Sequence, residues 1–171
     1  MAKPRSRWSR FIRHLIAGRW DTRRRFPPSV LAQIQAAVAR CEARHPGEIR
    51  FIVEAGLSPA DVLAGLSPRD RAIDLFAQYR VWDTEHRNGV LIYVLLADRD
   101  VEIVADRGVA GGRVPQSEWE ACCRVMEQHF AAGRFAEGAV AGIEAAADLL
   151  ARHPPDRADV GNELPDAPIV L

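Results

Sequence analysis

Two apolar segments, separated by a short turn, constrain the centre of the fold. Residues 90–96 (VLIYVLL) form a continuous apolar run, which is typical of a strand covered on both faces. Residues 101–105 (VEIVA) follow after the turn 97–100, and a four-residue connection permits only an antiparallel hairpin. The sequence therefore predicts a hairpin whose first strand lies inside a sheet.

A further strand and a helix precede this hairpin. Residues 49–54 (IRFIVE) are mostly β-branched, aromatic or aliphatic, which favours a strand. Ser67 can cap a helix that begins at Pro68 and runs over 68–82, with Asp70 at its positive end. We expect its inner face to carry Ile73, Phe76, Ala77 and Arg80. The order strand, helix, strand predicts a β-α-β unit, which is almost always right-handed.

Helical patterns flank this centre on both sides. Apolar residues recur at helical spacing in 31–41, in 117–130 with Ser117 as the expected cap, and in 134–152. The expected fold is α/β: a three-layer α/β/α sandwich with a small mixed sheet and helices on both faces. Pro154 and Pro155 end the last helix, and 168–171 can pair with a sheet edge.

Charge divides the chain into an arm and a body. Residues 1–25 contain nine basic residues and one acidic residue, whereas the remainder has 14 basic and 22 acidic residues. We therefore predict a basic N-terminal arm (1–26), a central domain (27–153) and a Pro-rich tail (154–171). A basic arm can reach nucleic-acid phosphates, but the acidic body would repel that polymer, so we expect no nucleic-acid partner.

The arm contains an amphipathic helix over residues 6–20. One helical face gathers its large apolar residues: Trp8, Phe11, Ile12, Leu15 and Ile16. Such a helix can lie on an anionic membrane, where Arg10 and Arg13 meet lipid phosphates. It can equally dock its apolar face on the domain and leave the arginines in water, and this second arrangement is our expectation.

Composition excludes several classes of protein. Cys41, Cys122 and Cys123 show no CxxC spacing, so neither a zinc site nor a disulfide framework is expected. No stretch approaches the length of a membrane span, and the basic start lacks the apolar core of a signal peptide. We expect a cytoplasmic protein that can associate peripherally with the inner membrane.

The hairpin region resembles the TPM domain, a family long described as a domain of unknown function. The resemblance rests on residues 82–94 (WDTEHRNGVLIYV) and 98–108 (DRDVEIVADRG), which give a Thr, an Asn-Gly before a buried strand, a short turn and an Asp before a Gly-rich loop. It continues through Trp119, Met126 and Gly142 and spans about residues 27–153. The chain is similar to the shorter bacterial members.

The resemblance implies a range of functions. Family members include a thylakoid-lumen acid phosphatase, proteins that assist photosystem repair, and a receptor modulator in nematodes. Bacterial relatives bind calcium, and many occur near LemA-type membrane proteins. For this chain the resemblance implies a calcium site and, as partner, a LemA-type or other membrane protein or an anionic membrane surface.

The candidate site lies where the hairpin strands meet their outer loops. Asp106 ends the second strand and should fall beside Asn88, with Asp83 nearby, so these three oxygen donors are the expected metal ligands. Thr84, Arg107 and Gly108 should line the same loop. Asp98 and Asp100 lie at the other end of strands about six residues long, roughly 20 Å away, and cannot share the site. We interpret them as turn residues.

Two functions are compatible with this pattern. The preferred one is a non-enzymatic accessory or binding module that binds calcium weakly. The alternative is a metal-assisted acid phosphatase, in which the Gly-rich loop 108–112 before the Ser117 helix would hold an anion. A purely structural interpretation is also open, in which Asp106 accepts hydrogen bonds from loop amides and Asn88 is a turn residue.

Overall fold

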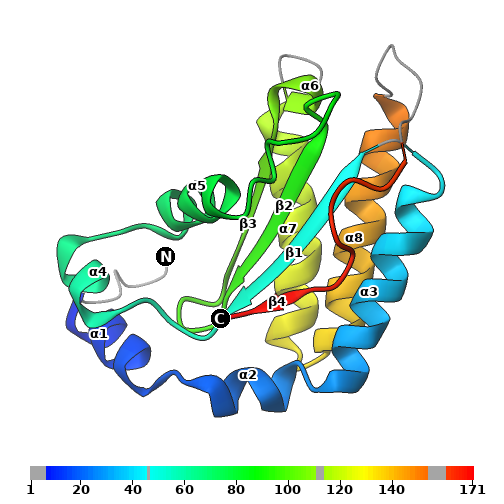
Figure 1. Ribbon diagram of the computed structural model, residues 1–171. Coiled ribbons are helices and arrows are strands. Elements are labelled where there is room, and N and C mark those ends of the chain that lie inside the picture. Colours follow the sequence, from blue (N-terminus) through cyan, green and yellow to red (C-terminus); the bar gives the residue numbers. More distant parts are fainter. Residues whose placement is uncertain (1–6, 46, 111–113, 154–160) are drawn as a thin grey trace.

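The computed structural model, which describes residues 7–45, 47–110, 114–153 and 161–171, is built around a small mixed sheet (Figure 1). The strand order is β3-β2-β1-β4. The strands are β1 (Glu48–Glu54), β2 (Gly89–Leu95), β3 (Asp100–Ala105) and β4 (Ile169–Val170). β1 is parallel to β2, and β2 is antiparallel to β3. The predicted β-α-β unit and hairpin are therefore confirmed.

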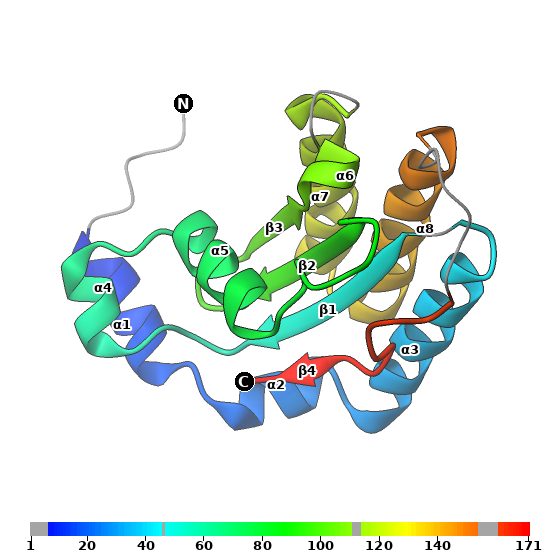
Figure 2. The same ribbon diagram turned by 45° about the horizontal axis from the view of Figure 1, so that its top comes forward.

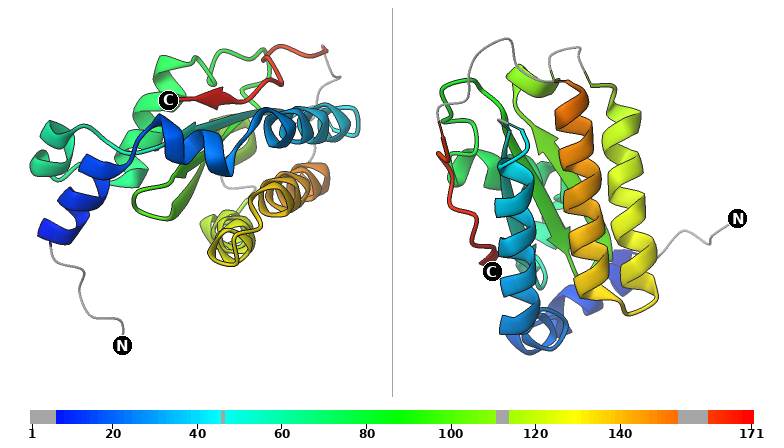
Figure 3. Two further views of the ribbon diagram at one scale, coloured as in Figure 1. Left: turned by 90° about the horizontal axis from the view of Figure 1, so that it is seen from below. Right: turned by 90° about the vertical axis from the view of Figure 1, so that its right-hand side faces the viewer.

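Three long helices cover one face of the sheet. These are α3 (Pro28–Glu42), α7 (Gln116–Ala131) and α8 (Phe135–Arg152), which lie side by side in Figure 3. Alternate strand residues such as Phe51 and Ile92 point into this layer, where they pack with Ile34 and Met126. All four side chains are buried, so this layer contains the larger core.

A thinner layer covers the other face. The crossover helix α5 (Pro68–Gln78) packs there with Ala72 and Leu75, against Leu91 and Tyr93 of β2. The C-terminal segment adds Leu164 to this second core, and the short helix α4 (Pro59–Ala64) adds Val62. Helices on both faces of a mixed sheet confirm the three-layer α/β sandwich.

A buried carboxylate fastens α5 to the sheet. Glu54 Oε1 and Oε2 accept hydrogen bonds from Arg71 at 2.9 and 3.0 Å, and the Tyr93 hydroxyl donates to Oε2 at 2.7 Å. Burial and the adjacent Glu54 raise the pKa of Tyr93, so its hydroxyl remains a donor. Because every member has a partner, this network is structural.

Three local predictions about helices were wrong, at least in part. α5 begins with the expected Ser67 cap, which forms a capping box with Asp70, but it ends at Gln78, and Arg80 has a positive φ of 52°. Of the expected inner face, Phe76 packs on the second core, but Ile73 is exposed, and the buried residues of α5 are Ala72 and Leu75. α7 begins at Gln116 after an extended Pro115 and has no side-chain cap, so Ser117 lies inside the helix.

The two chain ends meet the body at different edges. At the N-terminal end, α1 (Arg7–Ile16) lies beside α4 and connects through α2 (Arg19–Arg25) to α3 (Figure 2). At the C-terminal end, β4 pairs with β1, and Leu171 N donates to Val53 O at 2.9 Å. The predicted pairing of the tail with a sheet edge is thus confirmed. Within the described ranges, every helix is too short or too polar to cross a bilayer.

Candidate functional site

The loop before β2 is shaped by a buried threonine. The Asn88 amide donates to Thr84 Oγ1 at 3.0 Å, and the Arg87 amide donates to Thr84 O at 3.1 Å. Gly89 then passes so close to the chain that a Cβ there would lie 1.9 Å from Val81 O. The Asn-Gly pair therefore opens β2 at a point where only glycine fits.

The loop after β3 packs directly on this turn. The Asp106 amide donates to Gly89 O, and the Gly108 amide donates to Arg87 O, both at 2.9 Å. A Cβ on Gly108 would lie 2.3 Å from His86 O and 2.5 Å from Arg87 O. Gly108 is therefore required for the contact, and it belongs to the single-turn helix α6 (Arg107–Ala110).

Asp106 has one satisfied and one unsatisfied carboxylate oxygen. Its Oδ1 accepts from the Arg107 amide at 2.6 Å. Its Oδ2 is buried and has no hydrogen-bond partner among the described residues. A buried carboxylate oxygen without a partner is energetically unfavourable, so this atom is where a cation or water would be stabilised.

The structure brings some of the expected site residues together and separates others. Thr84, Asn88, Asp106 and Gly108 belong to the two loops that pack together. Asp83 is exposed, and its carboxylate lies 3.9 Å from Arg80. Arg107 contributes its amide, while its side chain is exposed. The anion-binding prediction for 108–112 falls partly on residues 111–113, which lie outside the described residues.

The loop supplies few of the ligands that a calcium ion requires. Calcium takes six to eight oxygen ligands, and tight sites supply several carboxylates. Among the described residues, no group of three His, Cys, Asp or Glu side chains could hold a metal ion. The loop offers the Asp106 carboxylate, and the main-chain oxygen of His86 lies against Gly108 in the neighbouring turn. The remaining ligands would have to be water.

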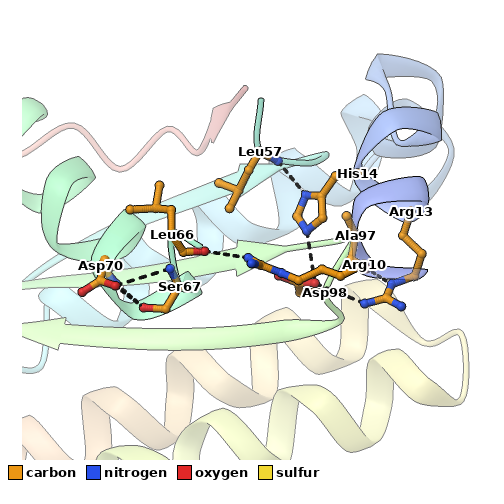
Figure 4. A network of polar contacts seen from close by, with 9 residues as sticks. All are labelled: Arg10, Arg13, His14, Leu57, Leu66, Ser67, Asp70, Ala97 and Asp98. Carbon is orange, nitrogen blue, oxygen red and sulfur yellow. Dashed lines mark hydrogen bonds and ion pairs between the residues drawn. The ribbon is translucent and has the colours of Figure 1, made fainter. Parts of the chain in front are cut away.

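The opposite end of the hairpin contains a second polar cluster that the sequence interpretation missed (Figure 4). Asp98 Oδ2 accepts from Arg10 Nε at 2.9 Å, and Oδ1 lies 3.4 Å from an Arg13 nitrogen and 3.1 Å from His14 Nε2. The same two arginines donate to main-chain oxygens, Arg10 to Leu66 O at 2.7 Å and Arg13 to Ala97 O at 2.9 Å. Asp98 is therefore the point at which α1 is fastened to the hairpin.

His14 completes this attachment. Its imidazole is buried, and its Nδ1 accepts a hydrogen bond from the Leu57 amide at 2.9 Å. Nδ1 is thus unprotonated, which leaves the ring proton on Nε2, facing Asp98. Burial alone would raise the pKa of Asp98, but the Arg10 hydrogen bond and His14 outweigh it and hold that pKa below its ordinary value. Asp98 is therefore a tertiary ion-pair residue as well as part of the turn.

The arm docks with its polar face inward, which reverses our expectation. Trp8, Leu15 and Ile16 on the outer side of α1 are 68%, 60% and 73% exposed, and Ile12 is also exposed. Phe11 is the one member of the apolar stripe that packs on the second core. The physical reason is that Arg10, Arg13 and His14 fall at i, i+3 and i+4, which presents three donors to one carboxylate. That spacing, visible in the sequence, was the available signal.

Comparison with known proteins places this geometry in a family. The model of the TPM domain matches residues 21–149, so α1 lies outside the matched region. The NMR structure of the BA42 protein from the psychrophilic bacterium Bizionia argentinensis is similar, with 30% identity and a TM-score of 0.71 over 84% of this chain and 93% of that chain.

A second solved structure shares the fold only. The N-terminal domain of a protein from P. gingivalis has 22% identity and a TM-score of 0.55, over 72% of this chain and 76% of that chain. The comparison with curated proteins found no match. Because the family model covers most of the sequence, and a solved relative covers nearly the same part, this chain belongs to the TPM domain family.

Proposed function

We propose that this TPM domain is a non-enzymatic binding module that attaches to an anionic membrane surface, the inner face of the membrane, through α1 and α2. The observation that carries the proposal is the reversed docking of α1. Its polar side chains bond to Asp98 and to nearby main-chain carbonyls, so its apolar face is exposed to solvent. Contiguous exposed apolar side chains on a soluble domain mark an interaction surface.

The chemistry of this surface fits a bilayer interface. Trp8 and Trp20 are both about 70% exposed, and tryptophan is favoured where a membrane meets water. Arg7, Arg19 and Arg23 are exposed on the same two helices, and each basic residue near an anionic membrane contributes about 1 kcal/mol. Arg10 and Arg13, which we predicted to face lipid, are instead part of the attachment to Asp98. The lipid contacts are therefore assigned to Trp8, Ile12, Leu15, Ile16 and Trp20, whereas Phe11 faces the core.

Vesicle sedimentation tests this attachment. Full-length protein should bind vesicles of phosphatidylserine and phosphatidylcholine at low salt and release them at high salt. Replacing Trp8, Leu15 and Ile16 by serine should weaken binding by at least about tenfold. The matched control replaces Trp82, Ile73 and Val170 by serine, since these are also exposed but lie on other elements.

Two outcomes would reject the membrane proposal. One is failure of the full chain to sediment with protein-free anionic vesicles at low salt. The other is an equal loss of binding in the control variant. Recovery of binding only when a LemA-type protein is incorporated would instead assign the same face to a membrane protein partner.

A second function, weak calcium binding, is favoured by the buried and unpartnered Oδ2 of Asp106. A carboxylate oxygen is a ligand type that hard cations such as calcium prefer. Titration with calcium should shift amides of residues 84–89 and 105–109 in a saturable way at millimolar concentrations. Absence of such shifts would leave Asp106 as a structural residue.

A phosphatase reaction at this loop has less support. Hydrolysis of a phosphate ester needs a metal pair or an acid–base pair together with a phosphate cradle. In the part of the chain that the structure describes, the loop brings one buried carboxylate and no three-residue metal cluster. Turnover of a generic phosphomonoester that disappears in Asp106→Asn would reverse this preference.

A further inference from the structure

β3 is one of the two edge strands of the sheet, and no strand of the described residues pairs with its outer side (Figure 2). The Asp106 amide bonds to Gly89 O, so even-numbered residues of β3 direct their amides and carbonyls toward β2. The main-chain amides and carbonyls of Val101 and Ile103 therefore point away from β2, at the open edge of the sheet. Such groups are a template for an added strand.

Side chains partly occupy the positions that an added strand would take. The Val101 amide donates to Glu127 Oε1 of α7 over a long 3.4 Å, and Arg69 of α5 donates to Ile103 O. Both are flexible charged side chains at the molecular surface. They can be exchanged for main-chain partners without breaking any bond within the sheet.

A groove of about 430 Å³ runs along this edge between α5 and α7. The groove is lined by Arg69 of α5, by Trp119 and Glu127 of α7, and by Val101 and Ile103 of β3. The Trp119 side chain is buried, and its Nε1–H has no acceptor among the described residues. An edge strand beside a helix, with a hollow between them, is the geometry that accepts an extended peptide.

The charge of the groove selects a basic occupant. Its acidic residues outnumber its arginines: Asp100, Glu102, Glu120 and Glu127 against Arg69 and Arg124. Arg69 pairs with Glu102 at 3.3 Å and Arg124 with Glu120 at 3.9 Å, which leaves Asp100 and Glu127 without a basic partner inside the groove. Burial, then Glu102 and Glu127, raise the pKa of Asp100 to about 7, so a nearby cation would relieve this repulsion.

The groove is a binding surface without an obvious nucleophile. Cys123 lies in its wall, but burial and the carboxylates Glu102 and Glu127 raise the pKa of this thiol to about 12. The thiol is therefore protonated at neutral pH and unreactive.

We propose that the groove between β3 and α7 binds an extended basic peptide segment of a partner protein, which pairs as a fifth strand with Val101 and Ile103 and places Lys or Arg side chains against Asp100 and Glu127. The site lies at the sheet edge opposite β4 and uses none of the side chains assigned to lipid contact. The proposal therefore stands or falls separately from membrane attachment.

The test uses the full chain and a labelled peptide of alternating basic and β-branched residues, RVKVR. Fluorescence anisotropy should show saturable binding, and NMR should show shifts centred on the Val101 and Ile103 amides and the Trp119 indole. The double variant Asp100→Asn with Glu127→Gln should weaken binding by at least about tenfold, the usual effect of losing a charge-assisted hydrogen bond. Glu137→Gln with Asp148→Asn removes the same charge from exposed α8 positions and should bind like the native chain.

Two further peptides separate strand addition from charge attraction. An RVKVR peptide that is N-methylated on alternate amides keeps its charge but cannot pair with β3, and it should not bind. The acidic peptide EVEVE should not bind either. The proposal is overturned by equal binding of the methylated peptide, by shifts located elsewhere, or by an equal loss in the α8 control. It is also overturned if β3 is blocked by self-association of the chain in solution.

Discussion

The two ends of the β2–β3 hairpin carry aspartates with opposite surroundings. At the turn, Asp98 receives Arg10, Arg13 and His14. At the open end, Asp106 Oδ1 accepts one amide, and its buried Oδ2 has no partner among the described residues. Sequence reasoning assigned function to the second and only a turn to the first.

The difference shows that the partners of a carboxylate indicate whether it has a structural role or can bind a ligand. A carboxylate that is surrounded by the chain's own cations is already neutralised and holds the fold together, as Asp98 holds α1. A carboxylate with a buried oxygen that accepts no hydrogen bond still lacks a partner after folding, and an external cation can supply one. The ion pairs of Asp98 also have a consequence for α1: they hold its polar face against the domain and therefore expose its apolar face.

The largest expected effect is at Asp98. Asp98→Asn leaves two arginines and a buried imidazole facing a neutral amide, so we expect the free energy of unfolding to fall by about 3 kcal/mol. Urea denaturation measures the loss, and hydrogen exchange should show it concentrated in α1. Asp148→Asn, which removes an exposed carboxylate 3.7 Å from Arg44, should change stability by less than about 0.5 kcal/mol. Equal losses in the two variants would mean that the turn cluster has no special role.

The pH dependence of this attachment has a defined sign. The folded pKa of Asp98 is lower than the unfolded value near 3.8, so its stabilisation is present above that pH. It is lost as pH falls through the folded pKa. The Asp98→Asn variant should lack this acid-limb loss.

A smaller and opposite effect is expected at Asp100, two residues along the same turn. Its folded pKa of about 7 exceeds the unfolded value of 3.8, so native stability falls as pH rises from about 4 to about 7. Asp100→Asn should therefore be more stable than the native chain at pH 8, by about 2 kcal/mol after allowing for partial exposure, and equal to it at pH 4. Denaturation at the two pH values checks this, and a constant difference would contradict it.

Much of the central fold was predictable from sequence because its signals are local. The apolar run that became β2, the four-residue turn and the helix cap at Ser67 each depend on neighbouring residues only. The position of Asp106 beside Asn88 and Gly89 followed from hairpin register alone. These features required no knowledge of distant contacts.

The faces of α1 and α5 were not predictable by the same rules. The apolar face of an amphipathic helix usually points inward. In α1 the polar face points inward instead, because it bonds to Asp98, a residue 84 or more positions away in the sequence. For α5, the apolar set at Ala72 and Leu75 lies one residue out of phase with the set chosen from Ile73. One residue of shift rotates a helical face by about 100°, enough to turn Ile73 out to solvent.

At the open end of the hairpin, calcium tests whether Asp106 binds a cation. At ten times a millimolar dissociation constant, calcium should raise the unfolding free energy of the native chain by about 1.4 kcal/mol. Asp106→Asn should abolish this gain, whereas Asp83→Asn should keep it, because Asp83 is exposed beside Arg80. Thermal unfolding with and without calcium measures the difference. Loss of the gain in Asp83→Asn alone would move the site to the exposed side of the turn.

The smallest effect is expected on the outer face of α1. Leu15→Ser and Ile16→Ser should each change the free energy of unfolding by less than about 0.5 kcal/mol, because both side chains are exposed. Phe11→Ser on the same helix should cost about 2 kcal/mol, because that ring packs on the second core. Urea denaturation of the three variants separates the faces. If the outer-face variants lose as much as Phe11→Ser, then the apolar face is packed against the protein in solution and is not available to a membrane.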